Sequence, residues 1–426
     1  MTTFSPPASM LSTTSKAFSL LCLLNLFWPA SAFGNAATLP LTLLEAEATV
    51  ESDCTALNKA IREENMADIS TLLKTVDANC VTTTPDYETI NKDNGEVTWR
   101  RAHDRTPIVS AARTGNLDII NQLIDAGASI DNYASQDAPP LNAAAEEGHL
   151  DMVNFLLKKG ADVLTNSNGY GTALNAAARG GHNELVKVLL ASGSEINAQT
   201  NGQGSALNAA ARNGHVKTVA LLLDKGADIN SQTNGQGSAI NAAARNGHNE
   251  VIKLLADRGA NLDIQNNGQG SALNAAARNG NLATVKLLIA SGADLNVQTN
   301  GQGSALNAAS RNGQAAVVKY LIEKGADLNV HNNGQGSPLN AAARNGNKEI
   351  VQLLIDAGAD VDAQTNGQGS ALNAAARNGQ MDVVKLLVAK GADVNIRNNG
   401  QGSPLNAAMR NGNNEIVAYL LKQGAH

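Results

Sequence analysis

Asn201-Gly202-Gln203-Gly204-Ser205 decides the fold, because this stretch returns again and again at intervals of 33 residues. Further copies begin at Asn234, Asn267, Asn300, Asn333, Asn366 and Asn399, and a looser copy begins at Asn168. In steps of 33 residues back from Leu174, Leu141 and Ile108 occupy the same apolar position. The period predicts ten units over residues 106–426 and an eleventh, divergent unit around Leu57.

One unit, residues 205–233, shows what each repeat contains. Ser205 can cap a first helix over residues 206–212, and Gly214 can end that helix in the left-handed conformation. A second helix follows, and its apolar stripe consists of Val219, Leu222 and Leu223. Such a unit cannot bury its own stripe, so neighbouring units must stack. The sequence therefore predicts an all-α solenoid of helix pairs joined by short β-hairpin loops.

The repeated motifs resemble those of ankyrin-repeat proteins. Thr106-Pro107-Ile108, Ser337-Pro338-Leu339-Asn340 and Ser403-Pro404-Leu405-Asn406 are similar to the Thr-Pro-Leu-His-x-Ala motif of that family. The resemblance covers residues 53–426 apart from one insertion. It implies a protein-protein interaction scaffold whose concave stack of hairpins and first helices binds a protein partner.

Asparagine stands where the family usually has histidine, and it does so in nine units. The positions are Asn142, Asn175, Asn208, Asn241, Asn274, Asn307, Asn340, Asn373 and Asn406. An amide can donate and accept hydrogen bonds at once. We expect this row to bond backbone groups of its own and the neighbouring unit, as a structural ladder along the solenoid.

The amino-terminal part departs from the repeat. Lys16 is the only charge before an apolar stretch over residues 17–28, and Ala30-Ser31-Ala32 follows, a pattern typical of a cleaved signal peptide. The alternative is a membrane anchor, but about 12 apolar residues are too few for the roughly 20 that a spanning helix needs. We expect an exported, periplasmic or secreted protein with no stable membrane span after cleavage.

The predicted organisation has five parts. They are a signal peptide at 1–32, a linker at 33–52, a divergent capping repeat at 53–83, an inserted hairpin or loop at 84–105, and ten ankyrin repeats at 106–426. In an exported protein, Cys54 and Cys80 are predicted to form a disulfide across the helix hairpin of the capping repeat; the alternative is two free thiols in a cytosolic protein. In the insertion, Trp99 and Tyr87 are candidate anchors for a partner or pack over the first unit.

No catalytic or metal motif is present in the sequence. His149, His182, His215 and His248 recur at the 33-residue period, but equivalent positions on helices about 8–10 Å apart cannot share one zinc ion. We therefore expect no enzyme activity, no metal and no cofactor. The net charge of -6 lacks long blocks of one sign, which argues against nucleic acid as a partner.

Two rows remain as candidate partner-binding residues. An arginine row near the ends of the first helices consists of Arg113, Arg179, Arg212, Arg245, Arg278, Arg311, Arg344, Arg377 and Arg410, interrupted at Glu146. It can pair with carboxylates of a partner or only cover helix ends and bridge to nearby acids. The hairpin tips carry Gln203, Gln236, Gln269, Gln302, Gln335, Gln368 and Gln401.

The tips suggest a second function class, a glycan or cell-wall binding module. Seven amide side chains at one repeat position can bond sugar hydroxyls, although aromatic stacking platforms are missing there. Separately, Met409 and Tyr419 interrupt the small or aliphatic pattern of the last unit. Because terminal repeats normally need a polar outer face, the sequence also suggests end-to-end self-association.

Overall fold

The computed structural model describes most of the chain from residue 53 onward. The described residues are 53–84, 87–90, 97–100, 103–134, 137–166, 171–200, 204–232, 237–265, 270–298, 303–330, 336–364, 369–397 and 402–426. The predicted signal peptide and linker lie outside these residues.

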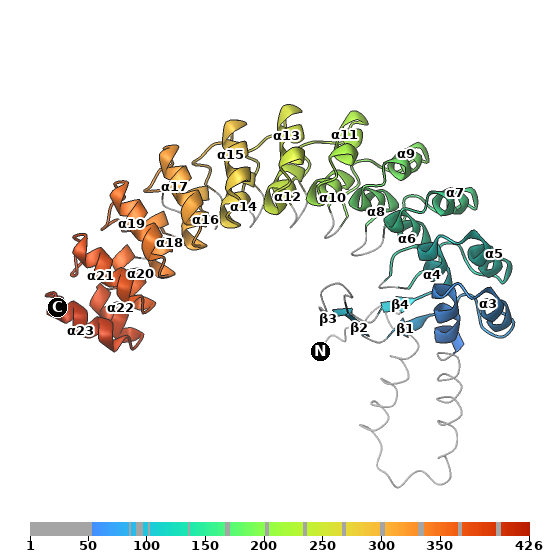
Figure 1. Cartoon of the computed structure of the whole chain (residues 1–426), viewed down its shortest axis with the longest axis horizontal. Helices are drawn as coiled ribbons and strands as arrows, with labels where there is room; N and C mark the ends of the chain where they lie inside the picture. The colour runs from blue at the N-terminus through green and yellow to red at the C-terminus, as the bar shows by residue number, and fades with distance from the viewer. Residues whose placement is uncertain are drawn as a thin grey trace, which may run out of the picture.

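Ten consecutive helix pairs form a curved solenoid between residues 107 and 422 (Figure 1). The first helices are α4 (Pro107–Thr114), α6 (Pro140–Glu147), α8 (Ala173–Gly180), α10 (Ala206–Arg212), α12 (Ala239–Asn246), α14 (Ala272–Arg278), α16 (Ala305–Arg311), α18 (Pro338–Arg344), α20 (Ala371–Arg377) and α22 (Pro404–Arg410). The second helices are α5 (Leu117–Asp125), α7 (Leu150–Lys158), α9 (Asn183–Ala191), α11 (Val216–Asp224), α13 (Asn249–Asp257), α15 (Leu282–Ala290), α17 (Ala315–Glu323), α19 (Lys348–Asp356), α21 (Met381–Ala389) and α23 (Asn414–Lys422). The predicted all-α repeat solenoid is confirmed.

First and second helices take different sides of the arch. Figure 1 shows the first helices along its inner side and the second helices along its outer side. Each first helix contacts the first helices of both neighbours, as α10 does with α8 and α12. The same pattern holds for the second helices. Among the described residues, the first helices therefore line the concave side of the arch.

Local sequence sets the ends of each helix as predicted. The Ser205 side chain accepts a hydrogen bond from the Asn208 amide, which satisfies one of the free amides at the start of α10. Gly214, with φ of 75°, follows the carboxyl end of α10, and Gly226, with φ of 91°, follows that of α11. Residues with a Cβ are strained at such angles, which explains why glycine returns at both positions in each unit.

The core is a continuous layer between helices rather than one deep centre. Ala209 to Ala211 are buried, as are Val219 and Leu222. The small alanines allow first helices to approach closely, while the aliphatic residues of successive second helices pack behind them. Leu223 is only half-buried, so the apolar stripe of the second helix is narrower than the sequence predicted.

The amino-terminal unit has a helix hairpin and then two short antiparallel ribbons. Residues 53–62 are helical, and α3 (Met66–Leu72) follows. Strand β1 (Thr82–Thr84) pairs with β4 (His103–Arg105), and β2 (Tyr87–Ile90) pairs with β3 (Val97–Arg100). In the structure the sulfur atoms of Cys54 and Cys80 lie at disulfide distance across the hairpin, with Cα atoms 6.0 Å apart. Among the described residues, no helix is both long and apolar enough to cross a membrane.

Ser310 is the one place in the first helices where the alanine layer carries a buried hydroxyl without a partner. Its side chain is fully buried and its Oγ makes no hydrogen bond in the described structure. Ser310→Ala is therefore expected to raise the free energy of opening α16 by about 1–2 kcal/mol, measured by native-state hydrogen exchange. Ser304→Ala is the matched control, because Ser304 caps the same helix and its loss should cost about 1 kcal/mol. A Ser310→Ala variant that opens more easily would contradict this reading.

Candidate functional site

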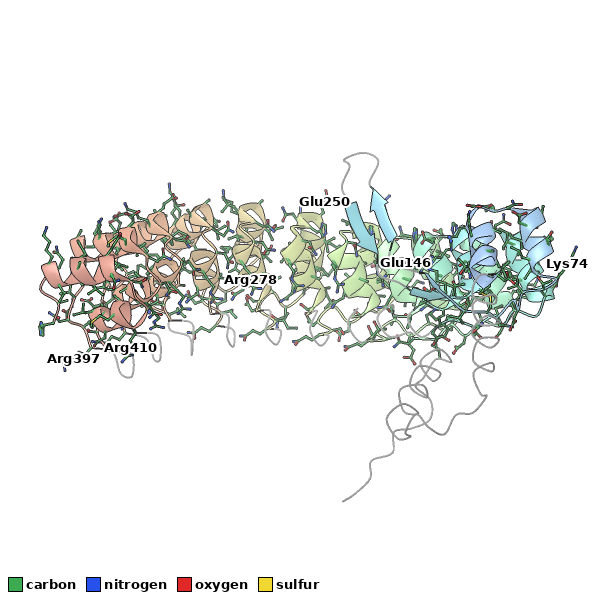
Figure 2. All side chains as sticks on the ribbon, turned by 90° about the horizontal axis from the view of Figure 1, so that it is seen from below. Lys74, Glu146, Glu250, Arg278, Arg397 and Arg410 are labelled. Atoms are coloured by element: carbon green, nitrogen blue, oxygen red, sulfur yellow. A yellow bond between two sulfur atoms is a disulfide. The ribbon has the colours of Figure 1, made fainter. Side chains whose placement is uncertain are left out.

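The concave surface carries formal charge of only one sign over its last seven units. The stretches that run through each hairpin tip and first helix contain no Asp, Glu or Lys; they are residues 198–214, 231–247, 264–280, 297–313, 330–346, 363–379 and 396–412. The carboxylates of these units belong to the second helices and the turns after them. In Figure 2, Glu250 lies at the upper edge of the solenoid and Arg410 at the lower edge. Arginine is the only charged residue type in the first helices from α10 to α22, which lie along the inner side of the arch in Figure 1.

The asparagine row ties each unit to the next. The amide nitrogen of Asn274 donates to the carbonyl oxygen of Gly303 at 2.6 Å, and its oxygen accepts from the Ser271 hydroxyl at 3.3 Å. The same bond to the following glycine carbonyl is made by Asn142, Asn175, Asn208, Asn241, Asn307, Asn340 and Asn373. These side chains are buried, whereas Asn406 is exposed. The buried amides therefore face the neighbouring unit and not a ligand.

The histidine row also bonds to backbone. Nε2 of His215 lies 2.8 Å from the carbonyl oxygen of Arg179, and Nε2 of His248 lies 2.8 Å from that of Arg212. Later units put an amide in the same place, as Asn347 does when it donates to the Ser310 carbonyl oxygen at 2.9 Å. Each of these side chains bonds a carbonyl oxygen at the carboxyl end of the first helix of the preceding unit, which has no partner within its own helix. Within the described residues no three His, Cys, Asp or Glu side chains gather where a metal ion could bind.

The amino-terminal end of the arginine row is paired within the chain. Glu146 occupies the row position between Arg113 and Arg179, and its two oxygens lie 3.3 Å from Nη1 of Arg113 and 2.9 Å from Nη1 of Arg179. Arg113 also lies 3.4 Å from buried Asp137 and 3.2 Å from Glu147. Burial acts to lower the pKa of Arg113, but these carboxylates raise it above its ordinary value. Arg113 and Arg179 therefore form salt bridges with nearby acids of the same chain, which was one of the two alternatives for the row.

Farther along the row, the arginines influence one another. Burial lowers the pKa of Arg212, and the positive charges of Arg245 and Arg179 lower it further. The pKa of Arg344 is lowered by burial and then by Arg377. Arg245 and Arg311 show the same direction for the same reasons. The row is thus a set of half-buried guanidinium groups whose repulsion is built into the solenoid.

Two further sets of residues were predicted to bind a partner. The tip residues Gln203, Gln236, Gln269, Gln302, Gln335, Gln368 and Gln401 lie outside the described residues, so glycan binding stays a prediction. Trp99 belongs to β3, where the strand pairing places its backbone opposite Glu88.

Sequence reasoning missed the acids that satisfy Arg113. Asp137 lies in the connector before α6, at the repeat position that Gln203 occupies two units later, and nothing in the sequence pairs it with Arg113. Glu146 carried a usable signal, because it stands 33 residues from both Arg113 and Arg179. Equal repeat positions in adjacent units place side chains next to each other.

Comparisons with known proteins identify one protein family. The family model described as ankyrin repeats in three copies matches residues 88–167, 141–233, 230–299, 273–365 and 339–426. Among solved structures, the ankyrin repeat domain of human ASB11 is 28% identical, with a TM-score of 0.45; the match covers 52% of this chain and 98% of that chain. A comparison with curated proteins gave no match.

Proposed function

Because this chain belongs to the ankyrin-repeat family, we propose that it is a non-catalytic scaffold that binds a protein partner on its concave surface. Ankyrin repeats are generally protein-protein interaction modules. The observation that carries the proposal is the arginine row on the inner first helices, which contain no Asp or Glu from α10 to α22. A rigid row of guanidinium groups can form charge-assisted hydrogen bonds with carboxylates of a partner. We propose neither a catalytic residue nor a cofactor.

Site-specific crosslinking in the native cell tests this proposal. A photoreactive residue at Asn312, which is exposed beside Arg311 at the end of α16, is expected to capture a protein. The same residue at Lys319, exposed on the second helix α17, is the control and is expected to capture much less. Equal capture from both positions, or none from Asn312, contradicts binding on the concave side.

We also propose that the protein is exported and that Cys54 and Cys80 are bonded there. The bond closes a loop with a sequence separation of 26, for which the chain-entropy model gives roughly 3–4 kcal/mol of stabilisation. Cys54→Ser should lower the free energy of opening residues 53–62 and α3 by about that amount in hydrogen exchange. The double variant Cys54→Ser/Cys80→Ser should lose no more than the single variant. If a reducing agent leaves the exchange of the unaltered protein unchanged, no such bond is present.

Self-association through the last unit is a further part of the proposal. The Met409 and Leu421 side chains are 59% and 54% exposed on α22 and α23. A second copy of the chain could cover this apolar surface and thereby remove it from water. We expect light scattering to show a mass that rises with concentration, and Met409→Lys to prevent the rise. A monomeric mass at high concentration contradicts self-association.

A further inference from the structure

We propose that the concave surface binds an extended acidic polypeptide segment with a carboxylate at every third residue, lying along the arginine row from Arg212 to Arg377. The inference rests on the proposed scaffold function and specifies the partner's chemistry. It depends on three features of the described residues: the single sign of charge, an internal example of the contact, and the spacing of the units.

The first feature is the electrostatic character of the row. Six arginines, Arg212, Arg245, Arg278, Arg311, Arg344 and Arg377, occupy equivalent positions on consecutive first helices. All six are half-buried, so they are more restrained than fully exposed cations. Neighbouring guanidinium groups repel one another strongly enough to lower the pKa of Arg212 and of Arg311 beyond the effect of burial. Carboxylates placed along the row would relieve this repulsion.

The second feature is an internal example of how a carboxylate meets the row. Glu146 stands at the row position of its own unit, and its two oxygens contact the arginines of the preceding and the following unit, at 3.3 Å and 2.9 Å. One carboxylate therefore reaches guanidinium groups from units on both sides of it. Beyond Arg179 the row position holds arginine in every unit, and a carboxylate of the partner would lie between neighbouring arginines as Glu146 does between Arg113 and Arg179.

The third feature is the distance between units. Packed helices lie about 8–10 Å apart, so successive arginines of the row have about that spacing. A polyproline II segment rises about 3.1 Å per residue with three residues per turn. Every third side chain of such a segment thus returns to the same face after about 9.3 Å.

Other conformations of the partner fit the row less well. In a β-strand, side chains on one face recur about every 6.6 Å or 13 Å. An α-helix with an acid at every seventh residue advances about 10.5 Å per heptad, but the acids drift about 20° around its axis each time. Over the five steps from Arg212 to Arg377 the last acids would turn away from the surface. The row therefore favours an extended segment.

A nucleic acid or polysulfated chain is a different class of partner, and the charge density argues against it. A nucleic acid strand carries one negative charge about every 3.4 Å, so a cation about every 9 Å would leave most phosphates unpaired. The net charge of -6 adds repulsion toward a dense polyanion. A sparse acidic polypeptide avoids both costs.

Binding of synthetic peptides to the full chain tests this inference. Repeated Glu-Pro-Pro triplets should bind at least about tenfold more tightly than an isomer with all glutamates in one block, measured by fluorescence anisotropy at low salt. Arg245→Gln/Arg278→Gln/Arg311→Gln should weaken triplet binding by about 10- to 100-fold, since each lost charged contact contributes about a factor of two to five. The matched control is Lys253→Gln/Lys319→Gln/Lys385→Gln, which removes the same charge from exposed positions on second helices and should leave binding within about twofold.

Several outcomes would overturn the inference. If the two peptide isomers bound with equal affinity, or if the arginine and lysine variants lost the same amount of affinity, net charge alone would explain the binding. Tighter binding of heparin or single-stranded DNA than of the triplet peptide, with the same dependence on arginine, would assign the row to another class of polyanion. If the photoreactive residue at position 312 captures a protein but the triplet peptide does not bind, the scaffold function stands and the proposal of an acidic segment as its partner is wrong. If the peptide binds but Asn312 captures no protein, the scaffold proposal fails by itself.

Discussion

Asn307→Ala is expected to lower the free energy of opening α16 and α18 by about 2–4 kcal/mol. The Asn307 side chain is fully buried, donates to the Gly336 carbonyl oxygen at 2.9 Å and accepts from the Ser304 hydroxyl at 3.0 Å. Alanine removes both bonds and leaves a buried carbonyl and a buried hydroxyl without these partners. Native-state hydrogen exchange of the two helices measures the loss.

Asn406→Ala is the matched control for this prediction. Asn406 has the same row position, but it is exposed and its oxygen accepts only from Ser403 of its own unit. Its loss should therefore cost no more than about 1 kcal/mol. Equal losses at the two positions would show that the bond between units contributes little.

Gly214→Ala is expected to cost about 2–4 kcal/mol, the second large effect. Gly214 has φ of 75°, and an added Cβ would lie 2.7 Å from Nδ1 of His248 in the next unit. The left-handed backbone is strained by a Cβ, and the imidazole must also move away from the Arg212 carbonyl oxygen, which it contacts at 2.8 Å. The variant therefore combines backbone strain with the loss of a contact between units.

Gly226→Ala separates these two contributions. Gly226 has a similar φ of 91°, but no atom lies within 4 Å of an added Cβ. It should cost only the backbone strain, about 1 kcal/mol. Urea unfolding and hydrogen exchange of α10 and α13 measure both variants, and equal destabilisation would contradict a role for the His248 contact.

The fold could be predicted from sequence because each unit repeats the same residues that begin and end its helices. Ser205 and Gly214 mark the ends of α10 at the expected residues. The structural role expected for the asparagines followed from their chemistry, since an amide can donate and accept hydrogen bonds at once. Within its own unit, however, the amide oxygen of Asn274 accepts from the Ser271 hydroxyl and not from the expected backbone group. Periodicity supplied the neighbour of every unit without any knowledge of tertiary structure.

The site was less predictable because it depends on contacts between residues without a shared pattern. The sequence left open whether the arginine row meets acids of the chain or of a partner. The answer for Arg113 depends on Asp137, which lies in a connector that matches no other unit. Leu223 shows a similar limit, since its place in the apolar stripe predicted burial but the side chain is only half-buried.

The bonds between units also determine how the molecule can change its length. Every junction from α6 to α22 uses the same amide-to-glycine bond. At nearly every one of these junctions, a polar side chain also bonds a carbonyl at the end of the first helix of the preceding unit, so these units share the same contacts. Removing one block of 33 residues, for example residues 238–270, would join Gly237 to Ser271 and recreate an ordinary junction. The number of units therefore sets the length of the solenoid. The gain or loss of one 33-residue unit changes this length by one helix pair and preserves the contacts between the remaining units.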